Sequence, residues 1–145
     1  MAYIDKAAMI LMFGEPELIQ LTDRDGAAGS IVDAVLDTAT INAESEVDSY
    51  VGSAYTLPLP TVPEVLKQMT ADIARFRLYG GQATEEVQKR YDRAVSWLRD
   101  VSKGVVSLGI KTTDPQPDSV VAVSGARPQV FTDALFNRMG PKWPV

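Results

Sequence analysis

Apolar residues recur three and four positions apart in four stretches of the chain, which is the spacing of amphipathic helices. The first predicted helix spans about residues 5–13, begins at a capping Asp5 and ends at Gly14. Residues 14–29 lack this periodicity and are expected to form a loop. Ser30 and Asp33 then form a capping-box pattern, and the second predicted helix runs from there to about residue 54.

Prolines in residues 57–60 end this second helix, because proline cannot continue a helix and pushes its predecessor to an extended conformation. Thr61 and Glu64 form another capping-box pattern ahead of a third predicted helix at about residues 62–79. Thr84 is the expected cap of a fourth helix, which continues to about residue 103.

The four apolar stripes and the short connections predict an all-α fold: a small antiparallel helical bundle of three longer helices and a short N-terminal one. We expect this bundle to occupy residues 1–104. Residues 105–145 are punctuated by proline and glycine and are expected to form an extended C-terminal arm, with residues 105–110 either a short strand or the start of that arm.

The end of the chain is apolar and aromatic, which is unusual for a solvated tail. Phe131, Leu135 and Met139 lie four residues apart, so one turn after another would present them on the same side of a helix. We predict that this segment docks on a partner, either the protein that the chain attaches to or a neighbouring subunit; folding back on its own bundle is the alternative. The predicted docking residues are Val130, Phe131, Leu135, Phe136, Arg138, Met139 and Trp143.

The net charge of −5 argues against wrapping nucleic acid through phosphate contacts. The charge is unevenly spread: residues 1–72 carry three basic and twelve acidic side chains, whereas residues 73–145 carry eleven basic and seven acidic ones. Opposite halves of neighbouring copies could attract each other head to tail, which closes into a ring when the rotation permits. Attraction between the two halves of one monomer explains the same pattern.

Two charged helix faces are candidate interaction surfaces. The acidic face of the second predicted helix consists of Asp33, Asp37, Glu44 and Asp48. Such a face is most often solvated, but in a ring it would line the lumen, repel a DNA backbone or contact the next subunit. The basic face of the fourth helix consists of Lys89, Arg90 and Arg93, for which a subunit contact, solvation and nucleic-acid binding are all open.

Catalysis has little support. The chain has no Cys and no His, so thiolate and imidazole chemistry are excluded, and the remaining side chains form no recognisable constellation. Residues 23–26 resemble part of a calcium loop, but the aligned first and twelfth positions are Leu21 and Val32, which cannot bind calcium; an Asp-Gly turn is the better interpretation. We expect no enzyme activity, no cofactor and no metal. The sequence shows neither a membrane span nor a signal peptide, so we expect a protein that stays in the cytoplasm where it is made.

An ordered series of short matches resembles the Mu-like phage and prophage proteins that are related to head–tail connectors. The series begins with residues 14–24 (GEPELIQLTDR), continues with residues 50–51, 55–59 and 62–63, and includes residues 72–79 (DIARFRLY). Arg90-Tyr91, Leu98 and residues 103–109 (KGVVSLG) complete it. The resemblance covers about residues 3–110 and continues weakly towards Phe131.

The resemblance implies a structural head–tail connector, or adaptor, of a tailed bacteriophage. Its expected partners are the portal protein, neighbouring copies in a ring that commonly has the portal's twelvefold symmetry, and the next neck or tail-completion protein. DNA would be only passing cargo in the lumen, no membrane would be involved, and the chain would reside in the virion neck after assembly in the host cytoplasm. The alternative is a small phage-encoded helical protein that binds nucleic acid or acts in host takeover.

Overall fold

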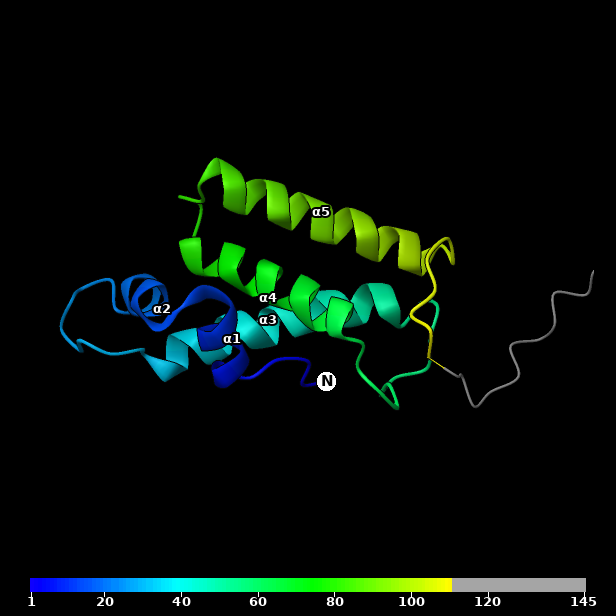
Figure 1. Ribbon diagram of the computed structural model, residues 1–145, viewed down its shortest axis with the longest axis horizontal. Coiled ribbons are helices and arrows are strands. Elements are labelled where there is room, and N and C mark those ends of the chain that lie inside the picture. The colour runs from blue at the N-terminus through cyan, green and yellow to red at the C-terminus, as the bar shows by residue number, and fades with distance from the viewer. Residues whose placement is uncertain (111–145) are drawn as a thin grey trace, which may run out of the picture. The chain divides into compact units, whose positions relative to one another are not determined.

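The computed structural model describes residues 1–110, which fold into five α-helices and contain no β-strand (Figure 1). The helices are α1 (Lys6–Phe13), α2 (Glu15–Thr22), α3 (Asp33–Val51), α4 (Glu64–Tyr79) and α5 (Glu85–Ser102). The predicted all-α antiparallel bundle is therefore confirmed, with one helix more than the periodicity indicated. The C-terminal arm beyond residue 110 lies outside the described residues.

Helix α4 is the centre of the bundle and runs between α3 and α5 (Figure 1). Five consecutive residues of this helix, Thr70–Ala74, are buried, so nearly its whole circumference is covered at mid-length. A helix that is buried all round cannot show a clean amphipathic stripe. Thr70 satisfies its hydroxyl by donating to the carbonyl of Leu66 at 2.8 Å, which allows a polar side chain to be buried there.

The first two helices pack as a short hairpin against one end of the bundle and bury Met9 and Leu18 completely. They are joined by the single residue Gly14, whose φ of +87° is a conformation that favours glycine. Asp5 caps α1 as predicted, with its carboxylate accepting a hydrogen bond from the backbone N–H of Ala8 at 2.7 Å. The loop that we expected in residues 14–29 is therefore wrong over residues 15–22.

Both predicted capping boxes are wrong, because each helix begins later than its pattern indicated. Val32 is the N-cap of α3 and Pro63 that of α4, and neither provides a side-chain hydrogen bond. Pro63 itself adopts an extended conformation (ψ 145°), which delays α4 to Glu64. The predicted cap of α5 is confirmed, since the Thr84 hydroxyl accepts a hydrogen bond from the backbone N–H of Val87 at 3.4 Å.

Residues 105–110 form neither a helix nor a strand, and they pack on the bundle. Leu108 is buried in the same core as the helices, and its backbone N–H donates to the Tyr55 hydroxyl at 2.9 Å. Tyr55 lies in the connection between α3 and α4, so this bond fixes the segment after α5 to that connection. The packed unit thus continues past residue 104, where the arm was expected to begin.

Candidate interaction surfaces

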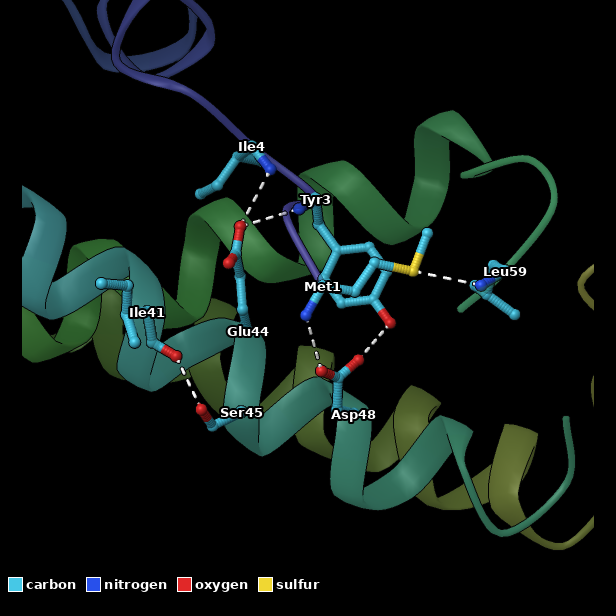
Figure 2. Close-up of polar contacts among 8 residues, drawn as sticks. All are labelled: Met1, Tyr3, Ile4, Ile41, Glu44, Ser45, Asp48 and Leu59. Carbon is cyan, nitrogen blue, oxygen red and sulfur yellow. Dashed lines mark hydrogen bonds and ion pairs between the residues drawn. The ribbon is translucent and has the colours of Figure 1, made fainter. Parts of the chain in front are cut away.

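The acidic face of α3 holds the N-terminal segment of the chain (Figure 2). The Glu44 carboxylate accepts hydrogen bonds from the backbone N–H groups of Tyr3 at 2.7 Å and Ile4 at 3.3 Å. Asp48 lies one turn further on. It accepts a hydrogen bond from the Tyr3 hydroxyl and forms an ion pair with the Met1 amino group at 2.9 Å. Tyr3 is buried, and this burial together with the Asp48 hydrogen bond raises its pKa well above the ordinary tyrosine value.

The other half of the acidic face remains exposed. Asp33 and Asp37 both face solvent, and Asp33 forms an exposed ion pair with Lys6 of α1 at 2.6 Å. An exposed pair of this kind contributes little to stability, typically about 0–1 kcal/mol. The four acidic residues thus have two roles: Glu44 and Asp48 position the N-terminal segment, whereas Asp33 and Asp37 remain accessible. That the face lines a lumen or a subunit contact stays a prediction.

Two of the three residues on the predicted basic face have partners within the bundle. Lys89 pairs with Glu85 at 2.6 Å on the exposed surface of α5. Arg90 lies between Glu86 and Asp72, at 3.4 Å from each. Arg93 is exposed on the same helix. Lys89 remains exposed despite its pair with Glu85, so Lys89 and Arg93 are the more accessible part of this face. The role of the face in a subunit contact stays a prediction.

Asp72 explains why Arg90 lies where it does. This carboxylate is buried in α4 with only 7% of the residue exposed. Burial raises the pKa of Asp72 because a charged carboxylate is poorly solvated there, and the nearby Arg90 guanidinium opposes that shift. Arg90 thus compensates a buried charge on the central helix, a role that the pattern of charges on α5 alone does not reveal.

Two further ion-pair clusters join the helices. Glu17 of α2 accepts hydrogen bonds from Arg75 at 2.6 Å and from the Tyr79 hydroxyl at 3.2 Å, both on α4. The Arg75 guanidinium also lies 4.8 Å from the ring centre of Phe13, within the range of a cation–π contact. These residues attach the α1–α2 hairpin to the central helix.

The second cluster is centred on Glu46 of α3. Its carboxylate accepts hydrogen bonds from Arg77 of α4 at 2.6 Å and from the Tyr91 hydroxyl of α5 at 3.1 Å. The Tyr91 ring stacks on Phe76 with 4.1 Å between ring centres. Sequence reasoning missed Glu17 and Glu46, because their partners are 31 to 62 residues away and helical spacing reports only neighbours on the same helix.

A groove lies where the N-terminal half of α3 meets the C-terminal end of α4. It has a volume of about 550 Å³. Ala39 and Leu78 are buried in its wall, and Gly80 and Gly81 contribute no side chains to its end. Arg24, from the loop after α2, reaches this end and donates a hydrogen bond from Nη2 to the Leu78 carbonyl at 2.8 Å, which satisfies one of the last carbonyls of α4.

The Asp-Gly turn in residues 23–26 is built around Asp23. Its carboxylate accepts hydrogen bonds from the backbone N–H groups of Ala27, Ala28 and Gly29 at 2.8 to 3.1 Å. These bonds, led by the one from Gly29, lower the pKa of Asp23 because they favour the charged form. The Asp23 carboxylate thus shapes its own loop.

Within residues 1–110, no group of three or more acidic side chains is placed to hold a metal ion. In the same range, no helix has the length and apolar character needed to cross a bilayer. The predicted docking residues Val130, Phe131, Leu135, Phe136, Arg138, Met139 and Trp143 lie outside the described residues.

Comparison with known proteins defines the class to which this chain belongs. The family model described as "Bacteriophage Mu, Gp36" matches residues 3–124. The chain is a member of this phage protein family, which confirms the resemblance to Mu-like phage and prophage proteins. The match includes every described helix and continues beyond residue 110.

Two relatives show how closely the chain follows this family. It is 36% identical over 92 residues to the Mu-like prophage FluMu protein gp36 of Haemophilus influenzae, a match covering 63% of the chain and 65% of the relative. The chain thus spans slightly less than two thirds of the FluMu protein. It is 32% identical over 115 residues to gene product J of Escherichia phage Mu, which covers 77% of the chain and 81% of that relative.

Proposed function

We propose that this protein is a structural head–tail connector of a Mu-like phage, an adaptor that forms a ring on the portal and links the capsid to the tail. Membership of the Mu Gp36 family supports a phage role. The resemblance to connector-related proteins supports the finer assignment. In this proposal the chain is not an enzyme, binds no cofactor, and works in the virion neck after assembly in the host cytoplasm.

The observation that best supports a structural role is the use of the polar side chains within the bundle. Glu17, Glu44 and Glu46 each accept hydrogen bonds from distant parts of the chain. These contacts fix the N-terminal segment and four of the helices relative to one another. A rigid small bundle of this kind suits a ring subunit, because each subunit must present the same surfaces to both neighbours.

The proposed partners are the portal, neighbouring copies in a twelve-membered ring, and the next neck or tail-completion protein. DNA passes through the ring as cargo, and no membrane takes part. In a ring, many equivalent contacts give high avidity even when each one is weak. The segment containing Phe131, Leu135 and Met139 would provide one such contact on every subunit.

Removal of residues 126–145 tests this proposal in the phage or prophage that encodes the chain. We expect DNA-filled heads and separate tails to accumulate, because the subunit would lack its docking segment. A sharper version replaces Phe131 and Leu135 by Asp, with Gln129→Asp and Asn137→Asp as the matched control. The control adds the same charge off the apolar side of the segment. Normal virions from the truncation would overturn the docking role.

DNA binding by the purified protein distinguishes the proposal from the alternative of a small nucleic-acid-binding or host-takeover protein. The connector proposal predicts weak binding without sequence preference at moderate salt. Tight binding that weakens steeply as salt is raised would favour the alternative, because phosphate contacts release counterions.

A further inference from the structure

One face of α3 is exposed and carries no charge along almost its entire length. This uncharged α3 face lies opposite the side of the helix that is buried in the core. It consists of Ala34, Val35, Thr38, Ile41, Asn42, Ser45 and Ser49. By contrast, the exposed side of α5 carries Lys89, Arg93 and Arg99 among its residues. Because charged residues are depleted in the cores of protein interfaces, an uncharged helix face in a chain with 23% charged residues is a candidate docking surface.

The hydroxyl groups on this face are already hydrogen-bonded within the helix. Thr38 donates to the Ala34 carbonyl at 2.7 Å. Ser45 donates to the Ile41 carbonyl at 2.9 Å (Figure 2). Ser49 likewise donates to the Glu46 carbonyl at 2.6 Å. These donors keep their partners when water is removed, so covering them leaves no hydroxyl hydrogen unsatisfied. Ile41, 60% exposed, and Val35, 37% exposed, supply the apolar area.

The groove described above continues this surface. Its α3 wall includes Val35, Thr38 and Asn42, which also belong to the uncharged α3 face. Its opposite wall is formed by Phe76 and Leu78 of α4. Because the two glycines at the end of α4 leave space there, a volume of about 550 Å³ is open beside the face. The surface can therefore take a helix along α3 and a large side chain in the groove.

We infer that the uncharged α3 face and its groove are the docking site for residues 129–139 of this same protein sequence. The segment has the required chemistry, because Phe131, Leu135 and Met139 form one uncharged side at helical spacing. Asp133 and Arg138 leave the segment without net charge, and Arg138 can pair with the exposed Asp33 or Asp37 at the edge of the face.

The length of the intervening chain allows this docking. Residues 111–128 reach about 60 Å when extended. The 19 residues of α3 span only about 28 Å, so any point on the face lies within reach. The same reach lets the segment dock on its own bundle or on that of a neighbouring copy. The inference names the partner surface for the docking role proposed above, and it rests on that role without requiring attachment to a capsid.

Cysteine cross-linking in the full-length protein tests the inference, because the chain has no cysteine of its own. Asn42→Cys on the face is combined with Ala134→Cys in the segment and treated with a short bismaleimide. The matched control combines Ser96→Cys, on the exposed side of α5, with the same Ala134→Cys. We expect about tenfold more cross-linked product from the first pair, because docking raises the effective concentration of its two thiols.

Two further samples identify the occupant. Adding Leu135→Asp to the first pair should reduce cross-linking to the control level, whereas Asn137→Asp should leave it unchanged. When the Asn42→Cys protein is mixed with the Ala134→Cys protein, a cross-linked heterodimer forms only if the segment docks on another copy. In the double variant, a cross-link within one chain reports docking of the segment on its own bundle. Equal yields from the face and control pairs would overturn the inference, and so would efficient dimers from Asn42→Cys alone. Normal virions from the truncation would instead overturn the docking role itself.

Discussion

Glu44 should contribute more to stability than its half-exposed position on an acidic face indicates. Its carboxylate accepts the backbone N–H groups of Tyr3 and Ile4, at 2.7 and 3.3 Å, from a segment 40 residues earlier in the chain. Tyr3 and Ile4 belong to the buried core. Glu44→Ala removes the acceptor and leaves these two donors without a protein partner, so the N-terminal segment loses its attachment to α3.

The size of the effect follows from these two contacts. A hydrogen bond to a charged group contributes about 1.5–3 kcal/mol, and the longer bond at 3.3 Å contributes less. Because Glu44 is half-buried and water partly replaces it, we expect Glu44→Ala to lower the free energy of unfolding by about 2–3 kcal/mol. In a unit of this size, that loss corresponds to a fall of about 8–12 °C in Tm. Glu44→Gln keeps one acceptor oxygen and should lose only about 1 kcal/mol.

Urea denaturation followed by circular dichroism measures these differences, with Asp37→Ala as the control. Asp37 lies on the same face of the same helix and is exposed, so its substitution should change stability by less than about 0.5 kcal/mol. The order Glu44→Ala, Glu44→Gln, Asp37→Ala is the prediction. Equal stability of Glu44→Ala and Asp37→Ala would refute the reasoning that the acidic face holds the N-terminal segment.

Two further predictions concern the central helix. Gly80 has a φ of +58°, and a Cβ atom there would lie 2.8 Å from Nη2 of Arg24. Gly80→Ala should therefore lower the free energy of unfolding, measured by chemical denaturation, by about 1–2 kcal/mol, and by less in an Arg24→Ala background. Equal losses in both backgrounds would contradict the contact. Because burial raises the pKa of Asp72, its contribution to stability falls as pH rises from the ordinary carboxyl value of 3.8 through the raised one. Arg90→Ala should therefore destabilise the protein more at pH 7 than at pH 4. Asp72→Asn should change the free energy of unfolding by under about 1 kcal/mol and make it depend less on pH. A loss of stability in Arg90→Ala that is independent of pH would contradict this account.

The three long helices could be predicted because apolar residues recur at helical spacing through each of them over more than four turns, although α4 is buried on nearly all sides at mid-length. Helix α2 could not, because only Leu18 and Thr22 are buried in its eight residues and no side chain caps it, whereas the equally short α1 begins at the capping Asp5. The available signals were local: Pro16 near the helix start and acidic residues in its first turn, which favour a helix N-terminus. Gly14 outweighs these signals, because a glycine directly after a helix predicts a loop rather than a joint of one residue.

The interaction surfaces were harder to predict, because charge along a helix does not reveal its partners. Lys89 and Arg90 share a face with Arg93, yet Arg90 is turned towards the buried Asp72 of another helix. Glu44 and Asp48 share a face with Asp37, yet only the fold brings Tyr3 to them. The uncharged α3 face could have been found from the sequence, since its positions are spaced regularly between the acidic and the buried sides. A mixed set of small, apolar and hydroxyl residues has no motif of its own, so only its lack of charge marks this face in the sequence.

The central claim is that this member of the Mu Gp36 family joins the head to the tail. An image reconstruction of the virion neck, from the phage that encodes this protein, tests that claim most directly. The account predicts a ring between the portal and the tail into which the five-helix unit of residues 1–110 fits once per subunit. A neck in which no ring accommodates this bundle, with the chain absent from purified virions, would contradict it.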